Sequence, residues 1–204
     1  MKEKNLMLSG ELYIASDEEL IKLQLAKHRF LDEFNNTKFE DYDKRRELAK
    51  GIFKKLGKNA IINKPFFCDY GCNISIGDNF YANFDSVFLD VNEIIIGDNV
   101  FLAPRVSLFT AGHPIDKDVR NTQLEFGKKI VIGNDVWIGG NTVVNPGVSI
   151  GDNVVIGSGS VVTKDIPGGV VAAGNPCKVI RKITEEDKNY WNEKKKLYYQ
   201  LKNN

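Results

Sequence analysis

The segment from residue 130 to 166 repeats a six-residue pattern of apolar and small side chains. An aliphatic residue returns at every sixth position: Ile132, Ile138, Val144, Ile150, Ile156 and Val162. The next residue is small or polar each time: Gly133, Gly139, Asn145, Gly151, Gly157 and Thr163. Four places beyond each aliphatic residue stand Val136, Thr142, Val148, Val154, Ser160 and Ile166. Six hexads in one phase form an internal repeat, which predicts the architecture before any local propensity does.

A looser form of the same repeat covers residues 58 to 110. Ile76 opens the phrase I-G-D-N, and apolar residues follow it at six-residue steps. The phase then slips by two residues, and Ile96 restarts it with a second I-G-D-N. The phrase recurs in similar form at Ile132 and Ile150, which lie 18 residues apart, or three hexads. That spacing is one full coil of a three-sided solenoid, so the sequence predicts a β-helix with one short strand on each side.

The positions within a hexad have distinct expected roles. We expect the aliphatic residue to point to the axis of the prism, where stacked coils bury it on its equivalents. We expect the small residue after it at the corner, where Gly, Asn or Asp tolerates the dihedral angles of a sharp turn. Because ladder hydrogen bonds run between coils, the two end coils need covers.

Residues 1–57 and 184–204 flank the predicted β-helix of residues 58–183 and are expected to be helical. Ser16 is predicted as the N-cap of a first helix, with Glu19 completing a capping box. A second helix is predicted from about residue 41 to residue 56, ending before Gly57. These helices should cover the first coil. Thr184 is predicted to cap a polar C-terminal helix that is either solvated or bridges subunits.

One segment, residues 110–129, interrupts the rhythm of the repeat. It lacks the aliphatic-small pattern, although Ile132 is still in phase with Leu108. The segment is predicted to be a loop extruded from one corner, without secondary structure of its own. Loops of roughly 20 residues are uncommon in compact domains and are usually functional. This loop contains His113, one of two histidines in the chain.

Composition excludes several classes of partner. A net charge of +1 gives no reason to expect nucleic acid or a membrane surface as a partner. No apolar run approaches the roughly 20 residues that span a bilayer, and the N-terminus has no signal-peptide core. Cys68, Cys72 and Cys177 fit neither a zinc site nor a disulfide framework. We therefore expect free thiols in a cytoplasmic protein without a catalytic metal.

Longer motifs make the chain resemble the galactoside and maltose O-acetyltransferases, within the hexapeptide-repeat acyltransferase superfamily. The resemblance covers nearly all of the chain and rests on GELY, CDYGCNISIGDNFYANFD, TAGHPID, WIGGNTVVNPGVSIGDNVVIGSGSVVTKDIP and AAGNPCKVIR. It implies a left-handed parallel β-helix, a handedness that spacing alone does not give. It also implies a homotrimer in which acetyl-CoA and the sugar acceptor bind in clefts between subunits.

The chemistry that the resemblance implies needs a base near neutral pH. Acetyl transfer from a thioester to a hydroxyl requires that the hydroxyl proton be removed as the oxygen attacks. A neutral imidazole suits this task, and its protonated form can then donate to the leaving thiolate. By resemblance His113 is this base, the backbone amide of Gly140 faces the oxyanion, and Asn83 is a transition-state partner beside the acceptor. Asn83 could instead be a plain corner residue of the coil.

The resemblance also implies binding residues. Acceptor contacts are expected at Asp69 and at Asp90 or its neighbour. A further acidic contact near the first helix is expected at Asp17, although the aligned position is Ala15. Acetyl-CoA is expected to contact Trp137, Gly140, Ser158, Thr163, Lys164, Lys178 and Arg181. Ser158 and Thr163 are also repeat corners, and Lys178, a lysine where relatives often have arginine, could be merely solvated.

Three other functions compete with this interpretation. The nearest is an acetyltransferase on the same scaffold that acts on an antibiotic or an amino sugar. A zinc enzyme of the carbonic-anhydrase type would need three histidine ligands, and this chain has only His28 and His113. A β-helix with a purely structural or binding role would leave the His113 loop and the basic tail without a purpose. The physiological acceptor and the hydroxyl that receives the acetyl group stay open.

Overall fold

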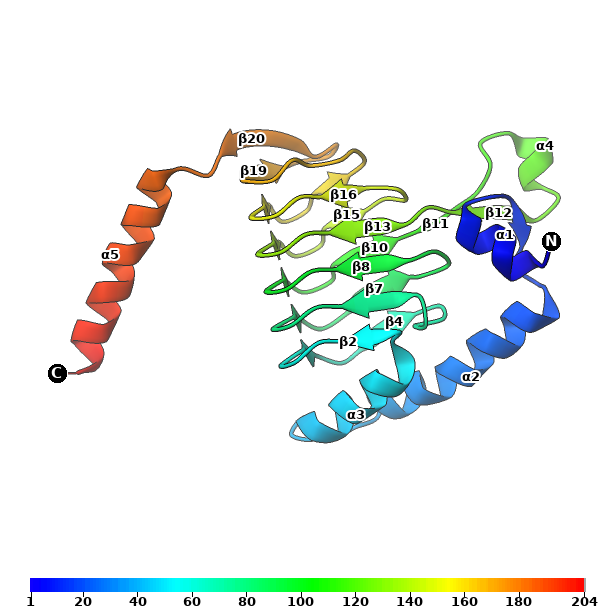
Figure 1. Ribbon diagram of the computed structural model, residues 1–204, viewed down its shortest axis with the longest axis horizontal. Helices are drawn as coiled ribbons and strands as arrows, with labels where there is room; N and C mark the ends of the chain where they lie inside the picture. The colour runs from blue at the N-terminus through cyan, green and yellow to red at the C-terminus, as the bar shows by residue number, and fades with distance from the viewer. Residues whose placement is uncertain (204) are drawn as a thin grey trace.

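The computed structural model describes residues 1–203, which form a three-sided parallel β-helix with helices at both ends (Figure 1). The first face stacks β2 (Lys55–Leu56), β5 (Ile74–Ile76), β8 (Ile94–Ile96), β13 (Ile130–Ile132) and β16 (Ser149–Ile150). The second face stacks β3 (Ile61–Ile62), β6 (Tyr81–Ala82), β9 (Phe101–Leu102), β14 (Trp137–Ile138), β17 (Val155–Ile156), β19 (Val170–Ala173) and β20 (Lys178–Lys182). The third face stacks β4 (Phe66–Cys68), β7 (Ser86–Leu89), β10 (Ser107–Phe109), β15 (Val143–Val144) and β18 (Val161–Val162).

Strand register confirms the coil length and explains the slip in phase. In the later coils Val131 pairs with Ser149, 18 residues on. In the earlier coils Ile76 pairs with Ile96, 20 residues on. The two extra residues lie between the third face and the first, where the chain passes from β7 to β8. The slip is therefore a wider corner on the early coils, and the strands stay in register across it.

The hexad residues form the core, as predicted. The six aliphatic residues that begin the hexads are each at most 2% exposed. The residues four places later are buried as well, and include Thr142 and Ser160 at 0%. Thr142 and Ser160 donate their hydroxyl hydrogens to the carbonyl of Gly157, which satisfies both polar groups inside the prism.

The predicted reason for the small residue after each aliphatic was wrong. Gly133 has no left-handed backbone; the positive φ lies two residues later, at Asp135, as it does at Asn141 and Asn153 in other coils. Gly133 is small because coils approach closely there. A Cβ on Gly133 would lie 2.9 Å from the carbonyl carbon of Gly151 in the next coil.

The recurring I-G-D-N phrase forms a ladder at the corner between the first and second faces. The Asp98 carboxylate accepts the backbone N–H of Asp78 at 2.7 Å, and Asn134 accepts that of Asp98 at 2.9 Å. Next to them, the amides of Asn79 and Asn99 are joined at 2.9 Å. Each polar side chain thus satisfies a donor in the neighbouring coil, which fixes the stacking at this corner.

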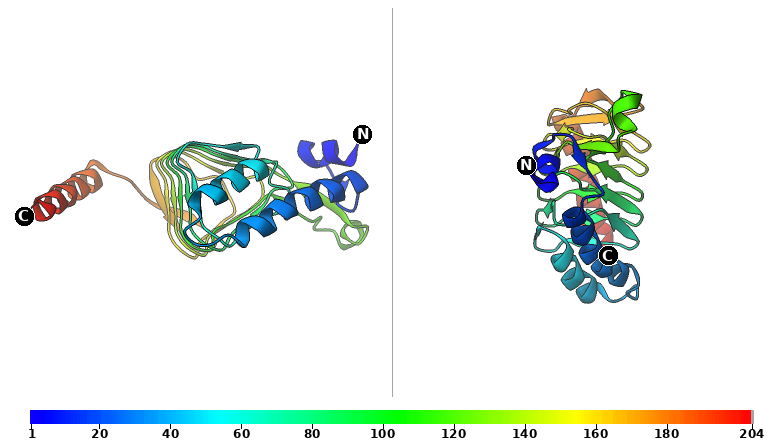
Figure 2. Two further views of the ribbon diagram at one scale, coloured as in Figure 1. Left: turned by 90° about the horizontal axis from the view of Figure 1, so that it is seen from below. Right: turned by 90° about the vertical axis from the view of Figure 1, so that its right-hand side faces the viewer.

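The N-terminal segment contains α1 (Glu3–Ser9), β1 (Tyr13–Ile14), α2 (Glu18–Asn35) and α3 (Tyr42–Ile52), and α2 and α3 cover the first coil (Figures 1 and 2). Three details differ from the prediction. The N-cap of α2 is Asp17, whose Oδ1 accepts the amides of Glu19 and Leu20, and Ser16 is exposed. Helix α3 ends at Ile52 because residues 55–56 pair with β5 as the first strand, so the β-helix begins before residue 58. Helix α1 was not predicted.

At the C-terminal end, β19 and β20 pair antiparallel over the last coil. Helix α5 (Glu185–Lys202) then begins at Thr184, as predicted, with a capping box between Thr184 and Asp187. Helix α5 buries none of its residues and stands away from the β-helix body (Figures 1 and 2). Within residues 1–203, no helix has the length and apolar content needed to cross a bilayer.

Candidate active site

The segment of residues 110–129 is a folded hairpin, which corrects the prediction of a structureless loop. It contains β11 (Ala111–Gly112), the short helix α4 (Lys117–Arg120) and β12 (Leu124–Gly127). Strand β12 pairs antiparallel with β11 on one side and with β1 on the other. The resulting three-stranded sheet projects from the corner between the third and first faces, on the right in Figure 1. We call this corner the hairpin corner.

The base of the hairpin is held by Asn92, a buried residue that the sequence analysis missed. Its Nδ2 donates to the carbonyls of Met7 at 3.1 Å and Gly127 at 3.0 Å. Its backbone N–H donates to the hydroxyl of Thr110 at 2.9 Å, and the amide of Lys128 closes the base on the Thr110 carbonyl. One asparagine therefore ties the N-terminal segment, the β-helix corner and both ends of the hairpin together.

His113 follows β11 directly and is exposed. The last paired residues of the hairpin are Gly112 and Phe126, so His113 is the first residue beyond the ladder. Within residues 1–203, the imidazole of His113 has no hydrogen bond and no ion pair. A histidine on a pinned hairpin with both ring nitrogens free can exchange a proton with a bound molecule.

Asp69 lies half-buried in the turn after β4, at the same corner as the hairpin. Burial raises the pKa of Asp69 to about 6; His28 on α2 opposes the rise and the negative charge of Glu125 adds to it. His28 therefore influences this site electrostatically. Within the described chain the Asp69 carboxylate accepts no hydrogen bond, so it can still accept one from a ligand.

Glu125 and Tyr13 complete this group and were also missed by the sequence analysis. The hydroxyl of buried Tyr13 donates to Oε2 of Glu125 at 3.1 Å. Burial, followed by the charge of Glu125, raises the pKa of Tyr13, so its hydroxyl keeps its proton near neutral pH. The alternating pattern of L-E-F-G in residues 124–127 was the available signal for a strand with Glu125 on one face.

Asp90 has a structural role that speaks against its predicted contact with the acceptor. It is 0% exposed, and its carboxylate accepts the backbone amides of Asp69, Tyr70 and Asn73 at 3.1, 2.8 and 3.2 Å. Burial raises the pKa of Asp90 to about 7, against the opposing effect of hydrogen bonds from the backbone amides of Gly71, Tyr70 and Asn73. Asp90 therefore shapes the turn that carries Asp69. Asp17, also predicted to contact the acceptor, is occupied as the N-cap of α2.

Asn83, Gly140 and Ser158 share the corner between the second and third faces, which we call the glycine corner. Asn83 is half-buried, and its Oδ1 accepts the amide of Phe84 at 2.9 Å, as a corner residue would. The Gly140 carbonyl accepts the amide of Gly159 at 2.8 Å. Within residues 1–203 the Gly140 amide donates no hydrogen bond. A free, partly exposed amide at a rigid corner is a suitable oxyanion donor.

Trp137 and Arg181 are aligned on the outer side of the second face. Ladder pairs connect Trp137 to Val155, Val155 to Val171 and Val171 to Arg181. The Trp137 side chain is 54% exposed. Arg181 is not free: it makes two hydrogen bonds to Asp187, of 2.6 and 2.9 Å, and these hold the pKa of Asp187 at about 2.

Lys178, at the start of β20, is exposed. Thr163 and Lys164 are exposed as well, but they follow β18 and lie at the hairpin corner. The predicted residues are thus divided between two corners of the prism. His113, Asp69, Thr163 and Lys164 belong to one, and Asn83, Gly140 and Ser158 to the other, with the third face between them. One chain does not bring the two sets together.

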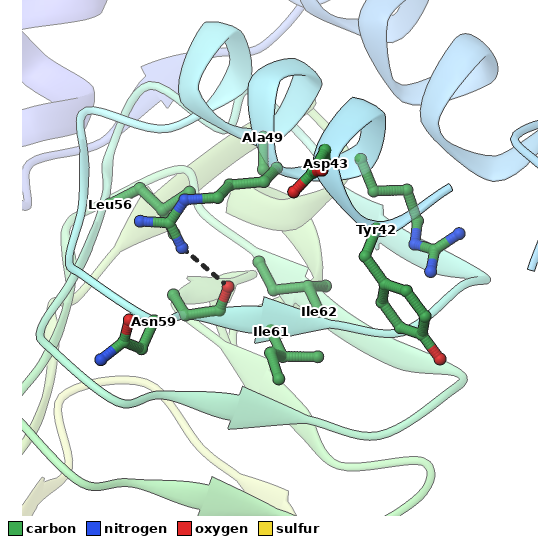
Figure 3. A pocket seen from close by; sticks show the side chains of 10 residues that line it. Tyr42, Asp43, Ala49, Leu56, Asn59, Ile61 and Ile62 are labelled. Carbon is green, nitrogen blue, oxygen red and sulfur yellow. Dashed lines mark hydrogen bonds between the residues drawn. The ribbon is translucent and has the colours of Figure 1, made fainter. Parts of the chain in front are cut away.

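A pocket of about 290 Å³ lies between α3 and β3, and none of the predicted residues lines it (Figure 3). Arg46 spans this gap and donates to the carbonyls of Gly57 at 3.1 Å and Ala60 at 3.2 Å. Ile62 and Ala49 contribute apolar walls. The pocket thus lies at the interface between the helical cover and the first coil, and Arg46 links the cover to that coil.

Comparison with known proteins agrees with this geometry. Residues 6–57 match the maltose acetyltransferase hexapeptide capping motif, and residues 129–164 match the bacterial transferase hexapeptide repeat (six repeats). The galactoside O-acetyltransferase of Escherichia coli K12 is 46% identical over 90% of this chain and 90% of its own length.

Solved structures show the same fold. A maltose O-acetyltransferase from Clostridium difficile 630 superposes with a TM-score of 0.89 at 52% identity, over 90% of this chain and 98% of that one. A galactoside acetyltransferase in complex with coenzyme A also gives 0.89, at 44% identity, over 92% of this chain and 94% of the other. The β-helix is left-handed, as the resemblance implied. The chain belongs to the galactoside and maltose O-acetyltransferase family of hexapeptide-repeat acetyltransferases.

Proposed function

We propose that this acetyltransferase moves the acetyl group of acetyl-CoA to a hydroxyl of a sugar, with His113 as the general base. The observation that carries the proposal is the position of His113, whose imidazole stands free on a hairpin pinned at its base by Asn92. The names of the relatives, galactoside and maltose O-acetyltransferases, support a sugar of the glucose, maltose or galactoside type as the acceptor.

In the proposed reaction His113 takes the proton of the attacking hydroxyl as its oxygen bonds to the thioester carbonyl carbon. The carbonyl oxygen becomes an oxyanion, which the free amide of Gly140 stabilises. When the C–S bond breaks, the sulfur leaves with the electron pair and takes the proton from His113. The products are the acetylated sugar and CoA, and no acetyl-enzyme forms. Asn83 lies at the same corner as Gly140 and is proposed to contact the transition state.

The residues predicted for acetyl-CoA fit an elongated anionic molecule. Exposed Trp137 and the glycine corner offer an apolar surface and free backbone groups. Lys178 and Arg181 lie on β20, at the end of the same face, where they can meet phosphates. Arg181 must exchange Asp187 for a phosphate to do so. Because this pair is exposed, the exchange costs little.

The division of the site between two corners supports a homotrimer with the active sites between subunits. In such an assembly the hairpin corner of one copy meets the glycine corner of the next, which unites His113 with Gly140. A mixing experiment tests this arrangement. Co-assembled His113→Ala and Asn83→Ala chains should regain activity, since some interfaces combine two intact corners. If sedimentation shows that the two variants assemble together but the mixture is as inactive as each variant alone, active sites shared between subunits are contradicted.

His113→Ala tests the base directly. Turnover should fall by ~2–4 orders of magnitude while the assembly stays intact by sedimentation, because general-base catalysis contributes on this scale. His28→Ala is the matched control for loss of a histidine and should lose far less. Near-normal turnover in His113→Ala would contradict the assignment of His113 as the general base.

A same-scaffold acetyltransferase acting on an antibiotic or amino sugar is the alternative. A thiol-release assay with acetyl-CoA separates the two. The panel should include glycosides, glucose, maltose oligomers, amino sugars and chloramphenicol. Fastest release with neutral sugars supports the proposal, and release only with the antibiotic or amino sugars supports the alternative.

A further inference from the structure

Glu125 occupies the centre of the three-stranded sheet that carries the hairpin. It lies on β12, between β11 and β1, and pairs in register with Tyr13. On its other side the ladder ends at the pair Gly112 and Phe126, and His113 is the first residue after it. Residues directly opposite in an antiparallel pair extend to the same face of a sheet. Glu125 therefore shares a face with Tyr13, and it is the neighbour in sequence of Phe126, whose partner Gly112 directly precedes the proposed base.

The carboxylate of Glu125 is held by a single neighbour. The Tyr13 hydroxyl donates to it at 3.1 Å, and the rest of its hydrogen-bonding capacity is unused within residues 1–203. Tyr13 is itself 0% exposed, so its ring cannot swing away from Glu125 without disrupting the second apolar cluster, formed by Met7, Tyr13, Leu20, Tyr70 and Val91. The Tyr13 hydroxyl thus orients the Glu125 carboxylate, which can still accept further hydrogen bonds from a ligand.

Asp69 shares the electrostatic environment of Glu125. The negative charge of Glu125 raises the pKa of Asp69, and both carboxylates raise the pKa of the Tyr70 phenol, after burial. Within the described residues neither Asp69 nor Glu125 forms an ion pair, and His28 on α2 opposes the rise in the pKa of Asp69. Two partly desolvated carboxylates beside one another are best satisfied by a ligand that donates several hydrogen bonds.

We propose that Glu125, oriented by Tyr13, is an acceptor-specificity residue that accepts a hydrogen bond from the acceptor next to the hydroxyl that His113 deprotonates. This inference rests on the proposed function and deepens it. With Asp69, Glu125 makes the acceptor side of the site anionic. The site then favours polyhydroxylated acceptors, and a matched sugar with an ammonium group in place of a hydroxyl would interact with Glu125 through its charge as well.

Glu125→Gln tests the proposal because it keeps the shape of the side chain and removes the charge. The KM for methyl glucoside should rise about 10-fold, the effect of losing a hydrogen bond to a charged group. The KM for the matched methyl glucosaminide should rise more, and the KM for acetyl-CoA should stay unchanged. Tyr13→Phe should shift both acceptor KM values in the same direction by a smaller factor. Glu47→Gln, on the exposed side of α3, is the control and should change none of them.

The proposal would be overturned if Glu125→Gln had the same KM as the wild type for both sugars.

A second measurement does not depend on enzyme turnover. Carboxyl NMR should show the pKa of Asp69 falling in Glu125→Gln, because a neighbouring negative charge is gone. A lowered pKa with unchanged acceptor KM would refute the specificity role while confirming the shared pocket. Normal turnover in His113→Ala, with a raised acceptor KM in Glu125→Gln, would refute the proposed base and leave the role of Glu125 standing.

Discussion

At the scale of single residues, surroundings separate aspartates that look alike in the sequence. Asp69 and Asp90 were both predicted to contact the acceptor, and both follow strands of the third face. Asp90 is fully buried and accepts three backbone amides, whereas Asp69 keeps a carboxylate with no partner in the described chain. Sequence shows the residue type but cannot show which carboxylate turns inward, because the three donor amides come from the coil 20 residues earlier.

Because Asp69 is expected to contact the acceptor, its raised pKa predicts that acceptor binding depends on pH. Its pKa is raised to about 6, so the carboxylate gains a proton as the pH falls through that value. A protonated carboxyl accepts hydroxyl hydrogens more weakly than a carboxylate. The acceptor KM should therefore rise as the pH falls from 7 to 5. Steady-state kinetics at saturating acetyl-CoA measures this, and Asp69→Asn should flatten the dependence. An equally steep rise of KM in Asp69→Asn would assign the titration to another group.

At the scale of elements, the sequence predicts well what depends on its own local pattern. The hexad strands, the capping of α5 by Thr184 and the existence of α2 and α3 all follow from periodicity and capping signals. The end of α3 and the fold of residues 110–129 depend on distant partners. Residues 55–56 become a strand because β5 is there to pair with them, and β12 forms between β1 and β11. No window of local sequence contains those partners.

Helix α5 is an element that its own chain does not need for stability. It buries none of its residues, and its exposed ion pair between Arg181 and Asp187 contributes little. A chain truncated after Ile183 should therefore unfold within a few degrees of the full-length protein in a thermal melt followed by circular dichroism. A large fall in the midpoint, together with a loss of assembly in sedimentation, would instead show that α5 contacts another copy of the chain.

Freeing Arg181 from this pair has a kinetic consequence. Asp187→Asn removes the competing carboxylate, so the guanidinium no longer has to exchange partners before it meets a phosphate. The KM for acetyl-CoA should fall modestly, by a factor of about 2–5, the range of an exposed pair. Arg181→Ala should raise it. An unchanged KM in both variants would remove Arg181 from the cofactor site.

At the scale of the whole molecule, the repeat determines the scaffold but not the complete site. Stacked coils specify the faces and the two corners on which the predicted residues stand. The repeat cannot specify how the hairpin corner and the glycine corner meet in the proposed homotrimer, because that contact would lie outside one chain. The resemblance named His113, Asn83 and Gly140 from short motifs, whereas Glu125 and Tyr13 emerge only once β12 is seen to lie beside β1.

Because each coil touches only its neighbours, close contacts between coils control the stability of the whole β-helix. Gly77 makes one such contact: a Cβ there would lie 2.5 Å from the backbone carbon and oxygen of Gly97 in the next coil. Backbone cannot move aside as a flexible side chain can, so Gly77→Ala must separate two coils. The free energy of unfolding should fall by about 1–3 kcal/mol or more in denaturant titrations. Ser75→Ala, on the outward side of the same coil, is the matched control and should stay within about 0.5 kcal/mol of the wild type. Equal stability of the two variants would mean that the coils stack loosely enough to absorb a methyl group, and that close approach is not what requires glycine after Ile76.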